Sequence, residues 1–235
     1  MIPPKTFVVT FDDGFENVYQ HAWPILRGLG IPATIFLATQ YLDAPEPFPF
    51  DDWELAGSMA VAPDSWRPLS TAQCAEMHAD GLIDIGSHTH AHEDFRGRPS
   101  AFSRDLALSL EVLRARLGLT KVPFAFPSGL TSQELISAAK QAGLLCGLNT
   151  QGIPVDHRSD PFTWGRFTST ETDTVGDLAA KLNGWYTFMR SAWRRLKYFP
   201  SDGVVADSDP ASDTDGVASP RLDLKRSGMD SRECH

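Results

Sequence analysis

The chain has 235 residues and carries 21 Lys and Arg against 30 Asp and Glu, which leaves a formal net charge of −9 at pH 7. This length allows one large domain or two small ones with a sizeable core. The negative charge, with no stretch that concentrates Lys and Arg, argues against a nucleic-acid-binding protein, and the three widely spaced cysteines, which form no CxxC, argue against a disulfide framework or a thiolate zinc site.

Along the chain, short β-rich runs alternate with helix-length segments. The expected strands are residues 6–11, 33–38, 83–87, 124–126 and 146–149, with 165–168 as a weaker sixth. The expected helices are residues 17–29, 71–79, 100–117, 132–142 and 175–196. Such alternation predicts parallel strands joined by right-handed crossovers, and therefore an α/β fold.

Particular residues mark where some of these helices begin and end. Ser70 with Gln73, and Thr131 with Glu134, have the spacing of capping boxes that open helices. Gly30 follows the first expected helix and favours its termination there. The caps therefore predict helix starts at residues 71 and 132.

The two ends of the chain bear on its location and on the extent of the folded domain. No basic and apolar leader precedes the first expected strand, and no apolar run approaches the ~20 residues that span a bilayer, so we expect no transmembrane segment and a cytoplasmic location. Residues 201–235 contain no aromatic residue and little Leu, Ile or Val, a composition that does not offset the entropy of ordering. We therefore expect a single folded domain at residues 1–200 and a disordered acidic and polar tail at 201–235, while the oligomeric state stays open.

Three polar clusters fall where expected strands end. They are Asp12-Asp13-Gly14 after the first strand, His88-Thr89-His90-Ala91-His92 after the third, and Pro127-Ser128-Gly129 after the fourth. In parallel barrels and open sheets, chemistry takes place at the carboxyl ends of the strands. Paired acids before a glycine also form ordinary solvated turns, but their coincidence with three histidines favours a functional site.

The acids and histidines together have the composition of a metal site. His88 and His92 are separated by about one helical turn and could converge on one cation, with Asp13 as an oxygen ligand. If the run were extended instead, His90 would lie on the same face as an alternative ligand; we favour His88 and His92. Asp12 then suits the role of base, because hydrolysis needs a proton acceptor separate from the ligands.

The chain resembles the polysaccharide deacetylase family (NodB-homology, carbohydrate esterase family 4) in three segments in order: TFDDG at residues 10–14, GIPATIFL at 30–37 and GSHTHAH at 86–92. The resemblance implies a distorted (β/α) barrel of the NodB-homology type with a divalent metal, usually zinc (Zn²⁺). It implies hydrolytic removal of N-acetyl groups from N-acetylhexosamine units of a polysaccharide or glycan precursor. Carried over residue by residue, it makes Asp12 the base and gives the metal ligands as Asp13, His88 and His92.

Two further segments resemble family motifs with a departure. FAFPSG, which contains Pro127 and Ser128, resembles the third motif, so Pro127 is a substrate-binding candidate and Ser128 a candidate backbone donor to the oxyanion. Many members place here an arginine that pairs with the base, whereas this chain has Ala125. Arg166, beside Trp164 in a segment near the expected fourth motif, could supply that charge from another strand, with Trp164 contacting the substrate; the alternative is a surface arginine at a strand edge.

The family's Leu-x-His motif, whose histidine protonates the departing amine, has no counterpart, since the only histidine after Arg166 is His235. A water, His157 or another group would have to act as the acid. The missing acid supports a second hypothesis, a degenerate member that binds glycan without turnover. Two histidines and one carboxylate also occur in non-haem Fe(II) oxygenases, although those enzymes sit on β-sandwiches.

Aromatic residues gather in the segment 41–66, which contains Phe48, Phe50, Trp53 and Trp66 among Pro and Asp. At a barrel mouth such side chains either stack on sugars or pack the loop onto the barrel. We favour packing.

Overall fold

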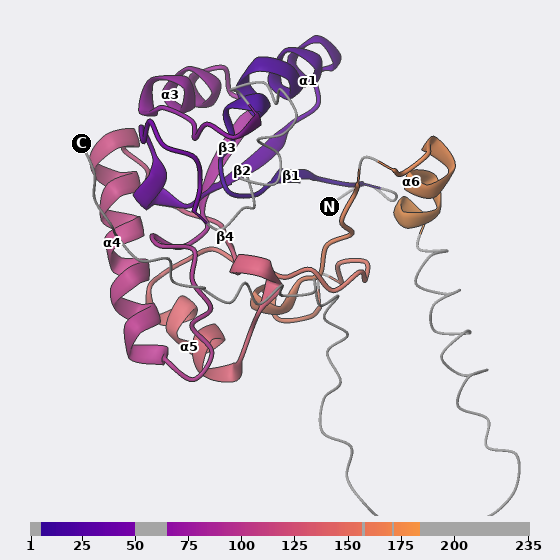
Figure 1. Cartoon of the computed structure of the whole chain (residues 1–235). Helices are drawn as coiled ribbons and strands as arrows, with labels where there is room; N and C mark the ends of the chain where they lie inside the picture. Colours follow the sequence, from indigo (N-terminus) through magenta and orange to yellow (C-terminus); the bar gives the residue numbers. More distant parts are fainter. Residues whose placement is uncertain (1–5, 50–64, 157, 171, 184–235) are drawn as a thin grey trace, which may run out of the picture. The chain divides into compact units, whose positions relative to one another are not determined.

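The structure, a computed structural model, describes residues 6–49, 65–156, 158–170 and 172–183. In these ranges the sheet is parallel and its strands follow the order β1-β2-β3-β4-β5. Their bounds are Val9–Phe11, Ala33–Leu37, Ile83–Ser87, Phe124–Ala125 and Gly147–Leu148, and Figure 1 labels the first four. Sequential order is that of (β/α) barrels, whereas doubly wound sheets reverse direction at a switch point. The α/β prediction is confirmed.

The weaker sixth strand, residues 165–168, is wrong for the described chain. Only an isolated bridge between Leu148 and Trp164 continues the sheet beyond β5.

The longest ladder joins β2 to β3, from Ala33 opposite Ile83 to Leu37 opposite Ser87. Because this register aligns the carboxyl ends of β2 and β3, the loops that follow them lie side by side.

The described helices are α1 (Trp23–Leu29), α3 (Thr71–Ala79), α4 (Pro99–Leu117), α5 (Gln133–Gln141) and α6 (Val175–Leu182), with 3₁₀ turns η2 (Thr39–Tyr41), η4 (Pro127–Gly129) and η5 (Pro161–Thr163). The first expected helix is divided, because a π-helical segment, η1 (Val18–Ala22), precedes α1. No helix in the described part of the chain is both long and apolar enough to cross a membrane. The expected continuation of α6 to residue 196 and the tail at 201–235 lie outside the described residues.

The helix ends test the predicted caps. Ser70 and Gln73 form the expected capping box at α3, and Gly30 ends α1 with a φ of 63°. The prediction of Thr131 was wrong: Ser132 caps α5 by accepting the Leu135 N–H. Two hydroxyl residues stand next to each other there, and the extended backbone of Ser132, at φ −144° and ψ 165°, makes the second one the cap.

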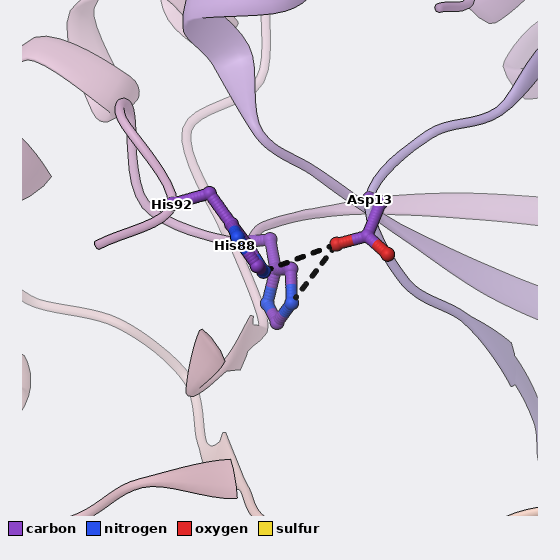
Figure 2. Close-up of side chains that lie close together, drawn as sticks. All are labelled: Asp13, His88 and His92. Atoms are coloured by element: carbon purple, nitrogen blue, oxygen red, sulfur yellow. Dashed lines mark ion pairs between the residues drawn. The ribbon is translucent and has the colours of Figure 1, made fainter. Parts of the chain in front are cut away.

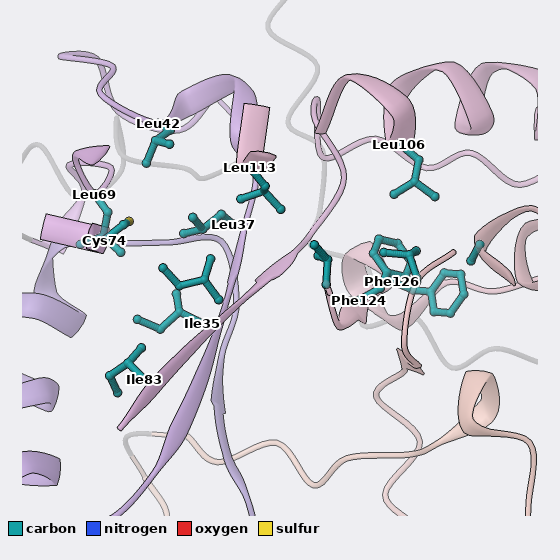
Figure 3. Close-up of a cluster of buried hydrophobic side chains, with 14 of the residues drawn as sticks. Ile35, Leu37, Leu42, Leu69, Cys74, Ile83, Leu106, Leu113, Phe124 and Phe126 are labelled. Carbon is teal, nitrogen blue, oxygen red and sulfur yellow. The ribbon is translucent and has the colours of Figure 1, made fainter. Parts of the chain in front are cut away.

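The hydrophobic core lies between the sheet and its helices. The α4 side chains of Phe102, Leu106 and Leu113 are at most 1% exposed. Figure 3 shows Leu106 near Phe124 and Phe126 of the β4 region. Burial of such side chains contributes roughly 1.5–3 kcal/mol each, so α4 is firmly fixed against the sheet.

The position of Phe48 distinguishes between sugar stacking and loop packing for this residue of the aromatic segment. Its side chain is buried, and its ring centroid lies 4.7 Å from that of Phe15 and 5.3 Å from that of Tyr41. Phe48 therefore packs its loop onto the fold, as favoured. Phe50 and Trp53 lie outside the described residues.

Candidate active site

The paired acids follow β1 at a sharp bend. Asp13 has a left-handed φ of 69°, and Gly14 donates its N–H to the Asp12 carbonyl at 2.8 Å. Neighbouring residues of a regular strand point to opposite faces, but this bend lets both carboxylates face the carboxyl edge of the sheet. The two then take different partners.

Asp13 faces two imidazoles from the loop after β3, as Figure 2 shows. Its Oδ1 lies 3.5 Å from His88 Nε2 and 3.2 Å from His92 Nε2. The loop is irregular rather than helical or extended, with left-handed φ values at Thr89 (68°) and His92 (55°). These bends, and not the one-turn helical spacing expected, bring the two rings together.

His90, the alternative ligand, points elsewhere. Its Nδ1 lies 3.0 Å from the Thr39 Oγ1 of η2. The extended run that would place three histidines on one face is therefore wrong. Within the described residues, the group whose ligand atoms all lie within 4.8 Å of one another is Asp13, His88 and His92.

Both imidazoles are prepared to donate a lone pair. The Ala125 carbonyl, 2.8 Å from His88 Nδ1, can only accept, so the proton sits on Nδ1 and the His88 Nε2 lone pair faces Asp13. Burial lowers the pKa of His88, and burial together with the neighbouring His88 lowers the pKa of His92 to about 4. Both rings are thus neutral at pH 7, the form that binds a metal.

The donor set fits a divalent metal ion. A tetrahedral site with bonds of about 2.0–2.1 Å has ligand atoms roughly 3.3 Å apart, close to the 3.2 and 3.5 Å observed here. One carboxylate and two imidazoles also suit zinc. The second partner of His88, the carbonyl of Ala125, is the outer contact typical of a metal-ligating histidine.

Asp12 is held by Arg166. The guanidinium makes two parallel hydrogen bonds of 2.7 Å to Asp12 Oδ1 and Oδ2, and donates to Thr10 Oγ1 at 3.0 Å. Arg166 is 15% exposed, so it is not a surface arginine. Burial alone would raise the pKa of Asp12, but the Arg166 hydrogen bonds, with positive charge nearby, hold it below the usual value.

Asp12 is also adjacent to the candidate ligands. Its Oδ2 lies 3.9 Å from His88 Nε2. An ionised carboxylate at this distance could accept a proton from a water placed beside the Asp13 group. The arrangement thus has separate acids for binding a cation and for taking a proton.

The remaining site candidates occupy the same edge of the sheet. Pro127 and Ser128 lie in η4, one residue after the end of β4, where Pro127 is buried and Ser128 is exposed with a φ of 53°. Trp164 pairs with Leu148 of β5, two residues before Arg166. Their roles toward a substrate stay predictions, and His157 lies outside the described residues.

Sequence reasoning missed residues that support the site. Thr10 binds Arg166, Thr39 binds His90, and Asp105 accepts the backbone N–H groups of His90 and Ala91. A signal for Asp105 was present, because this acid stands on the apolar face that Phe102, Leu106 and Leu113 define at helical spacing.

The fold and the site together define an α/β barrel-type protein with a candidate metal centre at the carboxyl edge of its sheet. The sequence profile described as polysaccharide deacetylase matches residues 2–147. The chain belongs to the polysaccharide deacetylase family.

Relatives of known name are similar to much of this chain. The poly-beta-1,6-N-acetyl-D-glucosamine N-deacetylase of Staphylococcus epidermidis is 29% identical over 169 residues, covering 68% of this chain and 53% of that protein. The Staphylococcus aureus (strain MRSA252) protein of the same name is 24% identical over 193 residues, covering 78% and 61%. The chain therefore spans between half and two thirds of the length of these relatives.

Solved structures confirm the predicted fold class, a distorted (β/α) barrel of the NodB-homology type. IcaB from Ammonifex degensii superposes with a TM-score of 0.60 at 26% identity, covering 77% of this chain and 74% of that one. The BpsB deacetylase domain from Bordetella bronchiseptica gives a TM-score of 0.59 at 23% identity, covering 71% and 72%.

Proposed function

We propose that the chain is a metal-dependent hydrolase that removes N-acetyl groups from N-acetylhexosamine units of a polysaccharide or glycan precursor. The observation that carries this proposal is the Asp12 carboxylate, clamped by Arg166 and 3.9 Å from the Nε2 of His88 in the candidate ligand group. Family membership and relatives named N-deacetylases support it. Residues 1–200 would form the catalytic domain.

Asp13, His88 and His92 would hold the metal ion, for which we propose zinc. Bound there, a zinc ion would supply Lewis-acid polarisation of the acetamide carbonyl and acidify a water molecule. The three protein ligands leave a coordination position open, as catalytic rather than structural zinc sites do.

The chain's own residues would carry the proton and charge movements. Asp12, kept ionised by Arg166, accepts a proton from the water that adds to the acetamide carbonyl. The backbone N–H of Ser128 is the proposed donor to the oxyanion that develops on the substrate. As the C–N bond breaks, Asp12 returns the proton to the departing nitrogen, directly or through a water, and acetate and the free amine leave. Pro127 and Trp164 are the proposed contacts to the sugar.

The first substrate to test is a β-1,6-linked oligomer of N-acetylglucosamine. Acetate release should exceed that from β-1,4-linked chitooligomers, in keeping with the names of the relatives. Elemental analysis should find zinc in the unaltered protein and much less in His88→Ala. A protein free of bound metal and equally active with and without chelator would contradict the proposal.

A second candidate is a degenerate member that binds glycan without turnover. The observation in its favour is the sequence after Arg166, where the only histidine is His235 and no Leu-x-His motif is present. Binding of acetylated oligomers by the zinc-loaded unaltered protein, with no acetate released from any of them, would favour this candidate. If the unaltered protein releases acetate, and Asp12→Asn abolishes this release while it still binds the oligomers, the non-catalytic candidate is excluded.

A further inference from the structure

Asp105 of α4 is a buried acid that the proposed chemistry does not use. The residue is 8% exposed. Its Oδ1 accepts the His90 N–H at 2.6 Å and its Oδ2 accepts the Ala91 N–H at 3.0 Å. Burying a carboxylate is costly unless hydrogen bonds compensate for the lost water, so the carboxylate and this piece of backbone depend on each other.

The backbone that Asp105 binds lies between the two candidate ligand histidines. The loop needs left-handed φ values at Thr89 and His92, a conformation that residues other than glycine seldom adopt. On its other side, the Gln40 N–H donates to the His90 carbonyl at 3.0 Å. The segment is thus bound both by η2 and by α4.

Helix α4 is a rigid support for this contact. Phe102 and Leu106, one turn before and one residue after Asp105, are buried in the core. A side chain mounted on a packed helix positions its partner more exactly than one on a loop.

We propose that Asp105 is a positioning residue, which fixes the bend of the His88–His92 loop through the His90 and Ala91 N–H groups and so aims the two Nε2 atoms at Asp13. This inference rests on the proposed function, because it assigns the support of the metal site proposed there. The two hydrogen bonds of Asp105 go to the backbone between the ligands, so its effect on the ligand side chains is indirect.

The test is Asp105→Asn with zinc affinity as the readout. The amide offers one acceptor oxygen and turns N–H donors toward the second backbone N–H, so the loop loses one hydrogen bond and gains an unfavourable contact. We expect zinc affinity, measured by competition with a chromophoric chelator, to fall roughly 10–100-fold. The visible spectrum of the cobalt-loaded variant should change too, because the two imidazoles are displaced.

Asp43→Asn is the matched control. Asp43 likewise accepts two hydrogen bonds from one short segment, the N–H and the hydroxyl of Thr71 at the start of α3, and it accepts a third from Arg116 of α4. We expect its replacement to lower the thermal unfolding temperature while zinc affinity and the cobalt spectrum stay unchanged. A carboxylate that merely stabilises the fold would give Asp105→Asn the same result.

The outcomes separate this inference from the proposed function. An unaltered protein that binds neither zinc nor cobalt overturns the proposed function. An unaltered protein that binds both, with a folded Asp105→Asn of equal affinity and identical cobalt spectrum, overturns only the role of Asp105. If circular dichroism shows that Asp105→Asn does not fold, Asp105→Ala takes its place. A further measurement needs no variant: rapid hydrogen exchange of the His90 and Ala91 amides in the unaltered protein overturns the role of Asp105.

Discussion

The two halves of the site are held in different ways. The cation half, Asp13 with His88 and His92, comes from the ends of β1 and β3, on either side of β2. Its loop is bound through backbone groups, among them the Thr89 carbonyl, which accepts the Thr39 N–H at 3.2 Å. This half is formed by the sheet and its nearest loops.

The base half, Asp12 with Arg166, joins positions 154 residues apart in the chain. The segment with Arg166 contacts β5 through the Leu148–Trp164 bridge, and the Asn149 N–H donates to the Trp164 carbonyl at 2.9 Å. From beside β5, Arg166 reaches the opposite edge strand, β1. The difference teaches that metal binding and base activation should be separable by mutation.

The largest separation is expected from Asp12→Asn. The amide cannot accept a proton from water as a carboxylate does, so acetate release should fall roughly 10²–10⁴-fold. Zinc content by elemental analysis should stay at the level of the unaltered protein, because Asp13 and both histidines are intact. Loss of zinc together with activity would show that the halves are not separable.

Arg166→Gln should weaken the base half and shift its pH dependence. Arg166 lowers the pKa of Asp12 against the opposing effect of burial, so its removal raises that pKa. Asp12 then stays protonated, and inactive as a base, up to a higher pH. The acid limb of the kcat/KM profile should move to higher pH, and the maximum should fall by less than the roughly 10²–10⁴-fold expected when the base itself is removed. Arg158→Gln, which removes an exposed arginine, is the control with an unchanged profile.

Gly86→Ala should disturb both halves through the core. A Cβ on Gly86 of β3 would lie 2.5 Å from the Phe36 ring and 2.6 Å from the Pro123 carbonyl oxygen. Phe36 also lies 5.6 Å beneath the Arg166 guanidinium. We expect a loss of about 1–3 kcal/mol in the free energy of unfolding by urea.

Gly28→Ala gives the matched comparison for that prediction. Gly28 lies within α1, and nothing is within 4 Å of its added Cβ. Alanine is favoured over glycine inside a helix by roughly 0.5–1 kcal/mol. Equal stability of the two variants would contradict the close packing of β3 against Phe36.

The smallest effect on stability is expected from replacing Ser109, which supports the loop of the cation half. Ser109 of α4 hydrogen-bonds Ser87 at 2.8 Å, and Ser87 Oγ accepts the Thr89 N–H at 3.2 Å. Ser109→Ala should cost about 1 kcal/mol in the free energy of unfolding. Ser103→Ala, at an exposed position of the same helix, should lower the free energy of unfolding by less. The reverse order in urea denaturation would refute the stabilising role of the Ser109–Ser87 hydrogen bond.

Several local features were predictable because they depend on near neighbours in the chain. The capping box of Ser70 and Gln73 and the end of α1 at Gly30 are examples. The Thr131 cap failed by one position, since two adjacent hydroxyl residues satisfy the same local rule. The sixth strand failed because residues 165–168 follow a single bridge and not a ladder.

The sequence by itself determined the alternating α/β pattern, the family, and which acids and histidines stand at strand ends. Only the tertiary structure decided three contacts: His90 hydrogen-bonds Thr39, Arg166 binds Asp12, and Asp105 accepts the N–H groups of the loop between the histidines. The physical reason is that strand periodicity and caps are set within a few residues. Left-handed bends at Thr89 and His92, and a contact across 154 residues, are held by the packing of the whole sheet.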